Sequence, residues 1–428
     1  MRPAEIPDSA EPSAGITLIR AGAIAGFDDA AGSGDGAARP GAVAAADGAV
    51  IDSGSADDLT RRYAVDAKNT VDCPDRLLLP GFVNAHTHFE LNAIGPQPYT
   101  GSFTEWVRML VDRRPSGTEL IGRSVAEAVS MSVAAATDAI GDIGGGRLGE
   151  AEAWRILRDA PLSGVYFPEL IGLGGESADN ELERLNELLA ETPQAGRMRR
   201  GVSPHAPYST GRKIYEAATK AAVDHELIVT THLAEMTEEH RFVADASGPF
   251  REFLESLGVW KDRFAVDYRD GYSAVQWMEP YLRRTPWLVA HCNYVTDDDI
   301  ALLAETEASV AYCPVASEYF GHTGHRYRDM LDAGVNVCLG TDSIVCQPPD
   351  ELQPLGILPQ MRRLYQRDQT DPAVLLRMAT SHGRRALQLD SSIRRLASVR
   401  FDPENPADPL TQVLQGNDPV VAIELSNG

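Results

Sequence analysis

Five short polar strings in this chain supply the residue types that a hydrolytic metal site requires. They contain His86 and His88, His205, His232 and Glu235, His291, and the run Gly340, Thr341, Asp342 and Ser343. Imidazole and carboxylate groups suit Zn²⁺, with Fe²⁺ as an alternative. A metal of this kind can lower the pKa of water to about 7. The strings therefore point to hydrolysis at a divalent metal.

His86 and His88 end an apolar run, GFVNA, and Phe89 follows them. On a strand, residues i and i+2 point to the same side, so both imidazoles can reach one metal. A solvent-facing pair in a loop is the commoner origin of such a spacing. The apolar flanks favour the strand end here.

The remaining strings each have a structural explanation as well as a chemical one. His232 and Glu235 could be a helix start with an acidic first turn, and Asp342 could cap the next helix. His291, in LVAHCNY, could be a histidine satisfied within the core. If these residues are instead catalytic, Glu235 would carry protons, and His291 would orient the attacking oxygen or stabilise developing charge. Their joint occurrence at the ends of the first, fifth, sixth and eighth apolar runs favours the catalytic interpretation.

Eight apolar runs of strand length alternate with stretches of helix length. The runs are 77–86, 137–144, 163–172, 199–206, 226–232, 287–292, 309–314 and 335–342, and the helical stretches include 124–136, 179–191, 211–225 and 298–306. Near-continuous apolar strands indicate a parallel sheet buried on both faces. Eight such units predict an α/β fold, a closed (β/α)₈ TIM barrel, whose chemistry lies at the C-terminal strand ends.

The segments outside the barrel have a different character. Residues 1–15 are rich in Pro, Ala and acidic residues, which predicts disorder. Residues 16–75 read as short strands broken by turns, and the tail 390–428 reads as strand again. We expect 16–75 and 390–428 to form a small composite β-sandwich domain beside a barrel spanning 76–389.

Composition excludes several classes of function. The 428 residues carry a formal net charge of −23, which argues against nucleic acid or anionic membrane as partner. The five cysteines are odd in number and widely spaced, and none forms a C-x-x-C pair, which argues against a disulfide framework. The sequence shows neither a signal-peptide pattern nor an apolar stretch long enough to span a membrane, and we expect a cytoplasmic protein.

The strings PGFVNAHTHFEL, SPHAPYS, THLAE, VAHC and LGTDS resemble the signature of the amidohydrolase superfamily, in its cytosine/adenosine-type aminohydrolase branch. The resemblance spans residues 77 to 389. It implies one divalent metal, with Zn²⁺ favoured over Fe²⁺, held by His86, His88, His232 and Asp342. It also implies Glu235 as proton shuttle and His291 as assisting base. The fourth-strand end offers His205 and not a bridging Lys, which favours one metal over two.

A narrower similarity lies in GSFTEW (101–106), GPFREFLESLGVW (248–260) and the segment 318–343. These resemble the aminofutalosine deaminase-like group, related to adenosine and S-adenosylhomocysteine deaminases. The resemblance implies deamination of a 6-aminopurine nucleoside, with a possible homodimer. The implied substrate-binding residues are His205, Phe103, Trp106, His322 and Ser343. Aromatics near a helix start are more often core, and His322 and His325 could equally be surface loop histidines.

One departure from this group bears on the substrate. Val315, Ala316 and Ser317 follow Cys313 and Pro314, where the group usually has an arginine, and we expect this change to alter the pocket wall. Two other functions stay open beside deamination. One is an amidohydrolase or chlorohydrolase acting on a triazine or cyclic amide, and the other is a non-catalytic barrel that binds a small molecule.

Overall fold

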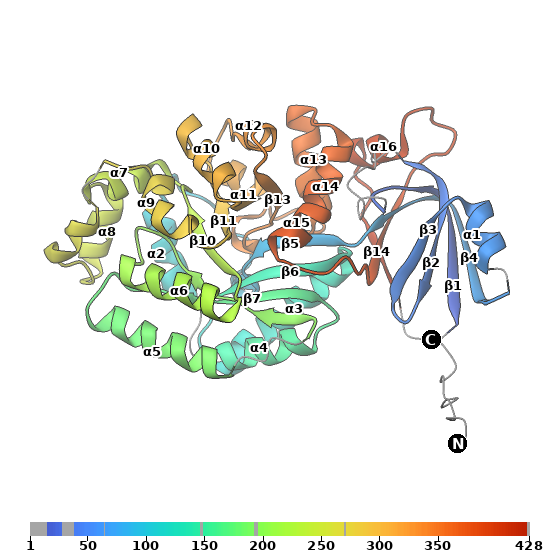
Figure 1. The fold of residues 1–428 in the computed structure, drawn as a ribbon. Coiled ribbons are helices and arrows are strands. Elements are labelled where there is room, and N and C mark those ends of the chain that lie inside the picture. The colour runs from blue at the N-terminus through green and yellow to red at the C-terminus, as the bar shows by residue number, and fades with distance from the viewer. Residues whose placement is uncertain are drawn as a thin grey trace, which may run out of the picture.

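The computed structural model describes residues 15–27, 38–63, 65–145, 149–191, 196–268 and 271–425. The expected disorder of residues 1–15 thus falls outside the described residues, apart from Gly15. Figure 1 shows two parts, an α/β barrel and a β-sheet at its side. No helix in the described ranges combines the length and the apolar character needed to cross a membrane.

The barrel strands form two parallel sheets. One contains β5 (Phe82–Thr87), β6 (Thr137–Gly144), β7 (Ser163–Leu170) and β8 (Met198–Arg200), with β9 (Ser203–Pro204) also pairing with β7; the other contains β10 (Val229–Leu233), β11 (Trp287–His291), β12 (Ser309–Tyr312) and β13 (Asn336–Leu339). Parallel bridges from Thr87 to Asp342 and from Val202 to Val229 join the two sheets at both edges. The strands thus follow the ring expected of a TIM-barrel-type fold.

Alternate residues of these strands fill the inside of the ring. A buried cluster joins Val83 and Ala85 of β5, Val165 and Phe167 of β7, and residues of β6, β11, β12 and β13. Leu387, which follows α15, packs into the same cluster. The interior is therefore a packed core, as in other (β/α)₈ barrels, and side chains that do chemistry must lie at its rim.

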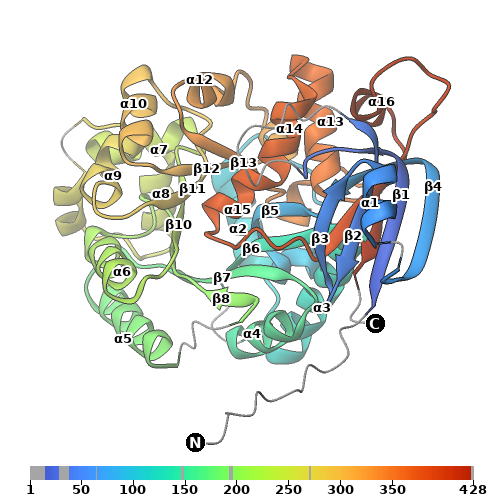
Figure 2. The same cartoon turned by 45° about the vertical axis from the view of Figure 1, so that its right-hand side comes forward.

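Helices surround the ring, as Figure 2 shows. Those along the barrel are α3 (Thr118–Ala134), α4 (Glu150–Asp159), α5 (Glu176–Glu191), α6 (Arg212–His225), α9 (Ala274–Leu282), α10 (Asp297–Glu305), α12 (Tyr327–Asp332), α13 (Ile357–Asp368), α14 (Pro372–Ala379) and α15 (Ser381–Ala386). Shorter elements follow the strand ends or lie near the tail: η2 (Phe89–Ile94), α2 (Phe103–Arg113), α7 (Thr237–Asp245), α8 (Pro249–Ser256), η3 (Asp262–Asp267), α11 (Pro314–Tyr319), η4 (Ile344–Cys346) and α16 (Pro409–Gln415). Capping boxes at Ser273 and Thr296 fix the starts of α9 and α10.

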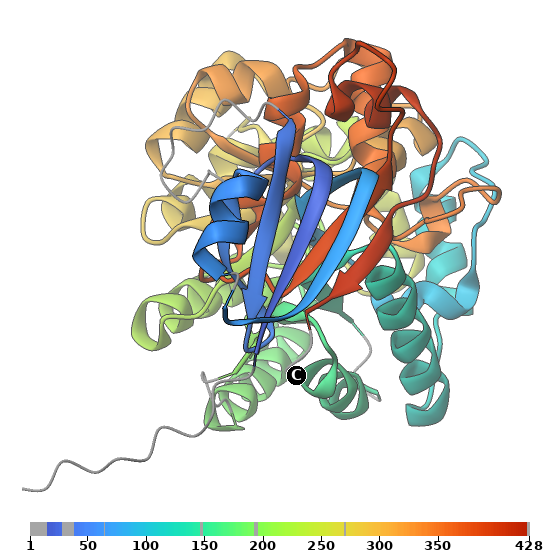
Figure 3. The same ribbon diagram turned by 90° about the vertical axis from the view of Figure 1, so that its right-hand side faces the viewer.

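The sheet at the side combines both ends of the chain (Figure 3). Its strand order is β15-β14-β4-β1-β2-β3, from β1 (Ile16–Ile24), β2 (Arg39–Ala46), β3 (Ala49–Gly54), β4 (Ala67–Pro80), β14 (Arg395–Arg400) and β15 (Val421–Glu424). The expected β-sandwich is not confirmed, because β14 pairs directly with β4 and the described strands join one sheet. Helix α1 (Ala56–Tyr63) packs its Leu59 on one face, against Leu18, Ala42 and Ala44.

The run 77–86, expected as one strand, is divided at Gly81. β4 ends at Pro80 in the side sheet, and β5 begins at Phe82 in the barrel. The Gly81 N–H donates to the Arg395 carbonyl at 2.8 Å, and a Cβ at this position would lie 2.6 Å from the Asp138 Cβ. The missing side chain therefore lets the chain pass directly from the side sheet into the first barrel strand.

Candidate active site

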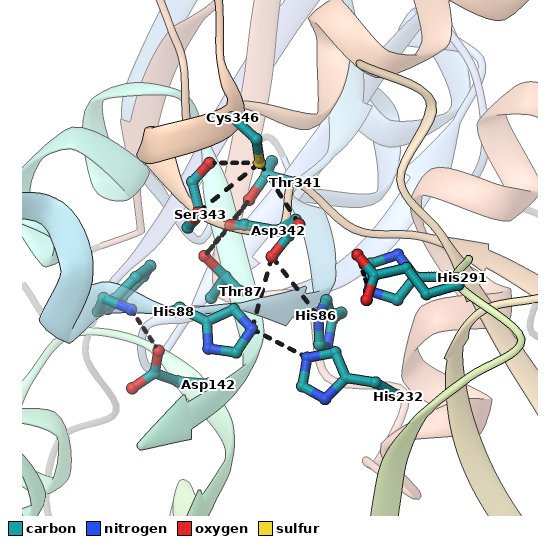
Figure 4. A network of polar contacts seen from close by, with 12 residues as sticks. His86, Thr87, His88, Asp142, His232, His291, Thr341, Asp342, Ser343 and Cys346 are labelled. Atoms are coloured by element: carbon teal, nitrogen blue, oxygen red, sulfur yellow. Dashed lines mark hydrogen bonds and ion pairs between the residues drawn. The ribbon is translucent and has the colours of Figure 1, made fainter. Parts of the chain in front are cut away.

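The expected ligand residues meet at the C-terminal rim of the barrel, as Figure 4 shows. His86 and His88 lie at the end of β5, His232 lies in β10, and Asp342 follows β13. The N–H groups of Thr341 and Asp342 donate to the His86 carbonyl, at 3.1 and 3.0 Å. This pairing closes the ring between the last strand and the first, and it brings the Asp342 carboxylate over the two histidines of β5.

The donor atoms of these residues converge on one point. His88 Nε2 lies 3.2 Å from His232 Nε2, and Asp342 Oδ1 lies 3.5 Å from His88 Nε2 and 3.8 Å from His86 Nε2. Neither ring nitrogen of His86, although buried, has a hydrogen-bond partner among the described residues. Three imidazoles and one carboxylate in this arrangement fit the donor set of a Zn²⁺ ion with an open position.

Backbone contacts and burial prepare this set for a cation. The His232 Nδ1 lies 3.0 Å from the His205 carbonyl, so it carries the proton and leaves the Nε2 lone pair free to bind. Burial, together with the neighbouring His232, lowers the pKa of His86 and His88, which keeps both rings neutral. Burial raises the pKa of Asp342 to about 6. A divalent cation at this point would favour its ionised form.

Glu235 and His291 lie beside the four donors. The Glu235 carboxylate is 6% exposed, and its Oε1 lies 3.8 Å from His291 Nε2. Burial, and secondly the negative charge of Asp342, raises the pKa of Glu235 well above its usual value. A carboxyl group whose pKa is raised above its usual value delivers and regains a proton more readily, which suits general acid–base work.

His291 is held in an uncommon backbone conformation. Its φ is 72°, and that of Asp342 is 58°, so both lie in the left-handed region that non-glycine residues rarely adopt. Such conformations persist where surrounding contacts enforce them, and they occur often at active sites. The contact at His291 comes from His325, whose Nε2 lies 2.8 Å from the His291 carbonyl and whose ring stacks on Tyr312 at 3.7 Å between centroids.

This placement changes the role expected for two loop histidines. His325 is half-buried, and desolvation of its ring lowers its pKa to about 4. The ring contacts the His291 carbonyl and does not line the cavity over the donor atoms. His322 accepts or donates a hydrogen bond at 2.8 Å with the Tyr294 hydroxyl, and it does not line the cavity over the donor atoms. Its expected contact with substrate stays a prediction.

Replacing His325 by Phe is expected to lower the free energy of unfolding by about 1–3 kcal/mol, because the His291 carbonyl loses its buried donor. His325→Gln, which can still donate an N–H, is the matched control and should keep most of that stability. Urea unfolding of both variants, with turnover measured alongside, tests the contact. Equal stability of His325→Phe and the parent protein would show that the hydrogen bond does not hold the conformation.

A cavity of about 150 Å³ lies over the donor atoms. Its lining includes all but two of the expected site residues, His86 and His322, and adds several that the sequence did not single out: Leu91, Val107, Leu110, Val111, Arg114, Glu169, Ile171 and Tyr208. A signal for Glu169 existed, because it lies near the end of the third apolar run, in PELIG. Tyr208 lies in the string SPHAPYS, where only His205 was singled out, and Arg114 lies in a connecting segment, where the sequence carries no comparable signal.

The expected substrate-binding residues occupy different walls of this cavity. Phe103 and Trp106 of α2 stack with 5.7 Å between ring centroids, and the Trp106 indole N–H donates to the Tyr319 hydroxyl at 3.0 Å. His205 follows β9 with its Nδ1 against the Ser209 hydroxyl, which leaves Nε2 toward the cavity. Ser343 lies next to Asp342 at the rim.

The segment Val315, Ala316 and Ser317, which replaces the usual arginine of the deaminase group, was expected to alter the cavity wall, but it does not line the cavity. These residues begin α11 and are absent from the lining. The Ser317 hydroxyl donates to the Asn293 amide oxygen at 2.6 Å, and the Asn293 amide donates to the Glu235 carbonyl at 3.1 Å. The segment therefore supports the backbone of Glu235 from outside the cavity.

Comparison with known proteins gives the family. Residues 77–397 match the model of the amidohydrolase family, and this range includes every expected site residue. The chain belongs to the amidohydrolase family. This membership confirms the superfamily expected from the sequence strings.

Relatives and solved structures agree with that assignment. The chain is 27% identical to the aminodeoxyfutalosine deaminase of Deinococcus radiodurans over 379 residues, which cover 82% of each protein. It resembles the crystal structure of Helicobacter pylori aminofutalosine deaminase with a TM-score of 0.75 and 19% identity, over 94% of this amidohydrolase and 95% of that chain. It also resembles the atrazine chlorohydrolase of Arthrobacter aurescens TC1 complexed with zinc, with a TM-score of 0.71 and 17% identity, over 93% and 91%. The structural similarities show the fold.

Proposed function

We propose that this amidohydrolase is a mononuclear metal-dependent deaminase, acting on an amino-substituted purine nucleoside or a related heterocycle. The observation that carries the proposal is the convergence of His86, His88, His232 and Asp342 beside the buried carboxyl group of Glu235. The deaminase relative at 27% identity supports the same chemistry. A carboxyl group that can transfer protons, placed beside four metal ligands, is suited to hydrolysing a C–N bond.

His86, His88, His232 and Asp342 would hold one divalent ion, with Zn²⁺ favoured over Fe²⁺. When bound, the ion supplies positive charge that lowers the pKa of water to about 7. The neutral imidazoles and the Asp342 carboxylate match this role, because ligands must be unprotonated to bind. The zinc in the Arthrobacter hydrolase is consistent with the choice of metal.

The protein's own groups would carry the protons. Glu235 accepts a proton from the attacking water and delivers it to the ring nitrogen beside the amine-bearing carbon, as the new C–O bond forms. Glu235 then takes the proton of the new hydroxyl group and passes it to the amino group, so that a C=O bond forms as the C–N bond breaks and ammonia leaves. His291, kept neutral by burial, orients the attacking oxygen and stabilises charge that develops on it. His205 would contact the ring, while Phe103 and Trp106 form an aromatic wall beside it.

An ammonia-release screen tests this proposal directly. The panel contains adenosine, S-adenosylhomocysteine, aminofutalosine, guanine, cytosine and aminotriazines, with chloride release and ring opening followed on chlorotriazines and cyclic amides. We expect ammonia from one or more of the purine nucleosides. Turnover confined to chlorotriazines or cyclic amides would replace deamination by the rival hydrolase, and binding without turnover of any compound would favour the non-catalytic barrel.

The predicted homodimer and cytoplasmic location stay predictions. Size-exclusion chromatography with light scattering tests the first, and cell fractionation tests the second.

A further inference from the structure

The buried carboxylate of Glu169 lines the cavity, and the proposed reaction assigns it no role. It lies at the end of β7 and is 5% exposed, and its side chain lines the cavity. Its Oε1 has no hydrogen-bond partner among the described residues. The His205 Nε2 lies 3.9 Å from Glu169 Oε1, which is beyond hydrogen-bonding range.

The position of this carboxylate is fixed by its surroundings. The backbone of Glu169 pairs with Ser203 of β9, and its carbonyl accepts a hydrogen bond from Arg184 at 2.6 Å. Gly145 leaves the space that the side chain needs, because a Cβ there would lie 2.4 Å from Glu169 Oε2. The backbone of Glu169 is therefore held at the strand end, and Gly145 leaves room for its carboxylate.

The neighbouring cation does not satisfy Glu169. The Arg114 guanidinium lies 3.8 Å from Glu169 Oε2, whereas its Nε donates to Glu90 Oε1 at 3.0 Å. Glu90 also accepts the Gly145 N–H at 2.9 Å. A buried carboxylate oxygen without a donor costs free energy, and the described residues do not supply that donor. A group that enters the cavity can.

The charge and polarity of the cavity restrict what that group can belong to. Arg114 is the one arginine or lysine among the described lining residues, and it already faces two carboxylates. An anionic substituent would therefore lack an uncommitted cation. The outer part of the cavity is apolar, with Val107, Val111 and Ile171 in its lining; Val111 is 58% exposed and Ile171 is 41% exposed. This region suits an apolar substituent.

We propose that Glu169 is a specificity residue that accepts a hydrogen bond from an N–H or O–H donor of the substrate, so that the enzyme prefers uncharged, donor-bearing substrates. The proposal rests on the proposed deamination and narrows its substrate class. For adenosine and its relatives the donor is a sugar hydroxyl or the exocyclic amino group, because their ring nitrogens carry no hydrogen. A competing explanation is a second cation, because Glu169, His205 and His232 offer ligand atoms within 4.8 Å of one another.

The test compares Glu169→Gln with the parent holoenzyme on adenosine, its 2′-deoxy, 3′-deoxy and 2′,3′-dideoxy forms, and free adenine. A hydrogen bond to a buried charged group predicts a fall in kcat/KM of about 10- to 100-fold for substrates that keep the donor. Substrates without it should change by less than about threefold. Loss of the effect in the deoxy forms assigns the donor to a 2′- or 3′-hydroxyl, and an effect that persists in 2′,3′-dideoxyadenosine assigns it to the 5′-hydroxyl or the exocyclic amino group. Glu187→Gln, the same chemical change at an exposed carboxylate of α5 outside the cavity, is the control.

Binding of purine riboside and its deoxy forms, measured by calorimetry, supplies a readout that does not need turnover. The parent protein should lose affinity when the donor is removed, and Glu169→Gln should not discriminate. An equal loss across all ligands, or two metals per chain in the parent and one in Glu169→Gln, would overturn the proposal. If the parent released no ammonia, the proposed function would fail, and the binding series would still decide the role of Glu169.

Discussion

Glu235→Gln is expected to keep the metal and to lower kcat by about 10²- to 10⁴-fold, the usual contribution of a general acid–base group. Gln has the size of Glu and fills the same buried position, but it cannot accept a proton from water or pass one to the ring nitrogen. The Glu235 carboxyl is suited to that transfer because burial raises its pKa well above the usual value. Single-turnover kinetics with metal analysis of the same preparation give both quantities.

Glu238→Gln is the control, because this carboxylate lies three residues along on α7 and is absent from the cavity lining. It should turn over close to the parent rate. Near-parental turnover in Glu235→Gln would remove the assigned proton shuttle. Loss of metal from Glu235→Gln would instead make this carboxylate a ligand.

Asp342→Asn is expected to weaken metal binding by more than about 100-fold, since even residues that only orient a ligand contribute 10- to 100-fold. The parent protein should carry about one divalent ion per chain, in keeping with a single set of four donors. An amide oxygen lacks the negative charge that Asp342 directs at His86 and His88. Turnover should fall with the metal content, and a chelator should abolish parent activity that added Zn²⁺ restores.

Metal content per chain by mass spectrometry, before and after dialysis, measures this effect. Asp371→Asn makes the same chemical change at the N-cap of α14, where Asn caps a helix as well as Asp, and should keep both metal and activity. Two ions per chain in the active parent enzyme would contradict the single-metal assignment. Full retention of metal by Asp342→Asn would remove Asp342 from the ligand set.

The sequence alone determined the order of the elements and the types of residue at their ends. Near-continuous apolar runs predict buried parallel strands, and the runs ending at His232, His291 and Asp342 correspond to β10, β11 and β13. This was possible because burial on both faces of a strand and the i, i+2 spacing of side chains are local properties of sequence. The family assignment rests on the same strings and is confirmed.

Some predictions failed because they depended on how distant segments pair. The run 77–86 has no local signal strong enough to divide it, and Gly81 becomes a boundary only because Arg395 and Asp138 pack against it. The sandwich was expected from strand content alone, whereas β14 joined the edge offered by β4. Strand pairing between chain ends is a long-range choice that periodicity does not encode.

The tertiary structure alone decided which polar side chains share a cavity. Val315, Ala316 and Ser317 lie outside it, and His325 supports the His291 backbone. Glu169, unremarked in the sequence, faces the cavity with an unsatisfied oxygen. A sequence lists potential ligands and proton carriers by type, but burial and distance determine whether a carboxylate is paired, proton-retaining or open to substrate. Those two quantities exist only once the barrel closes and brings the ends of its strands to one rim.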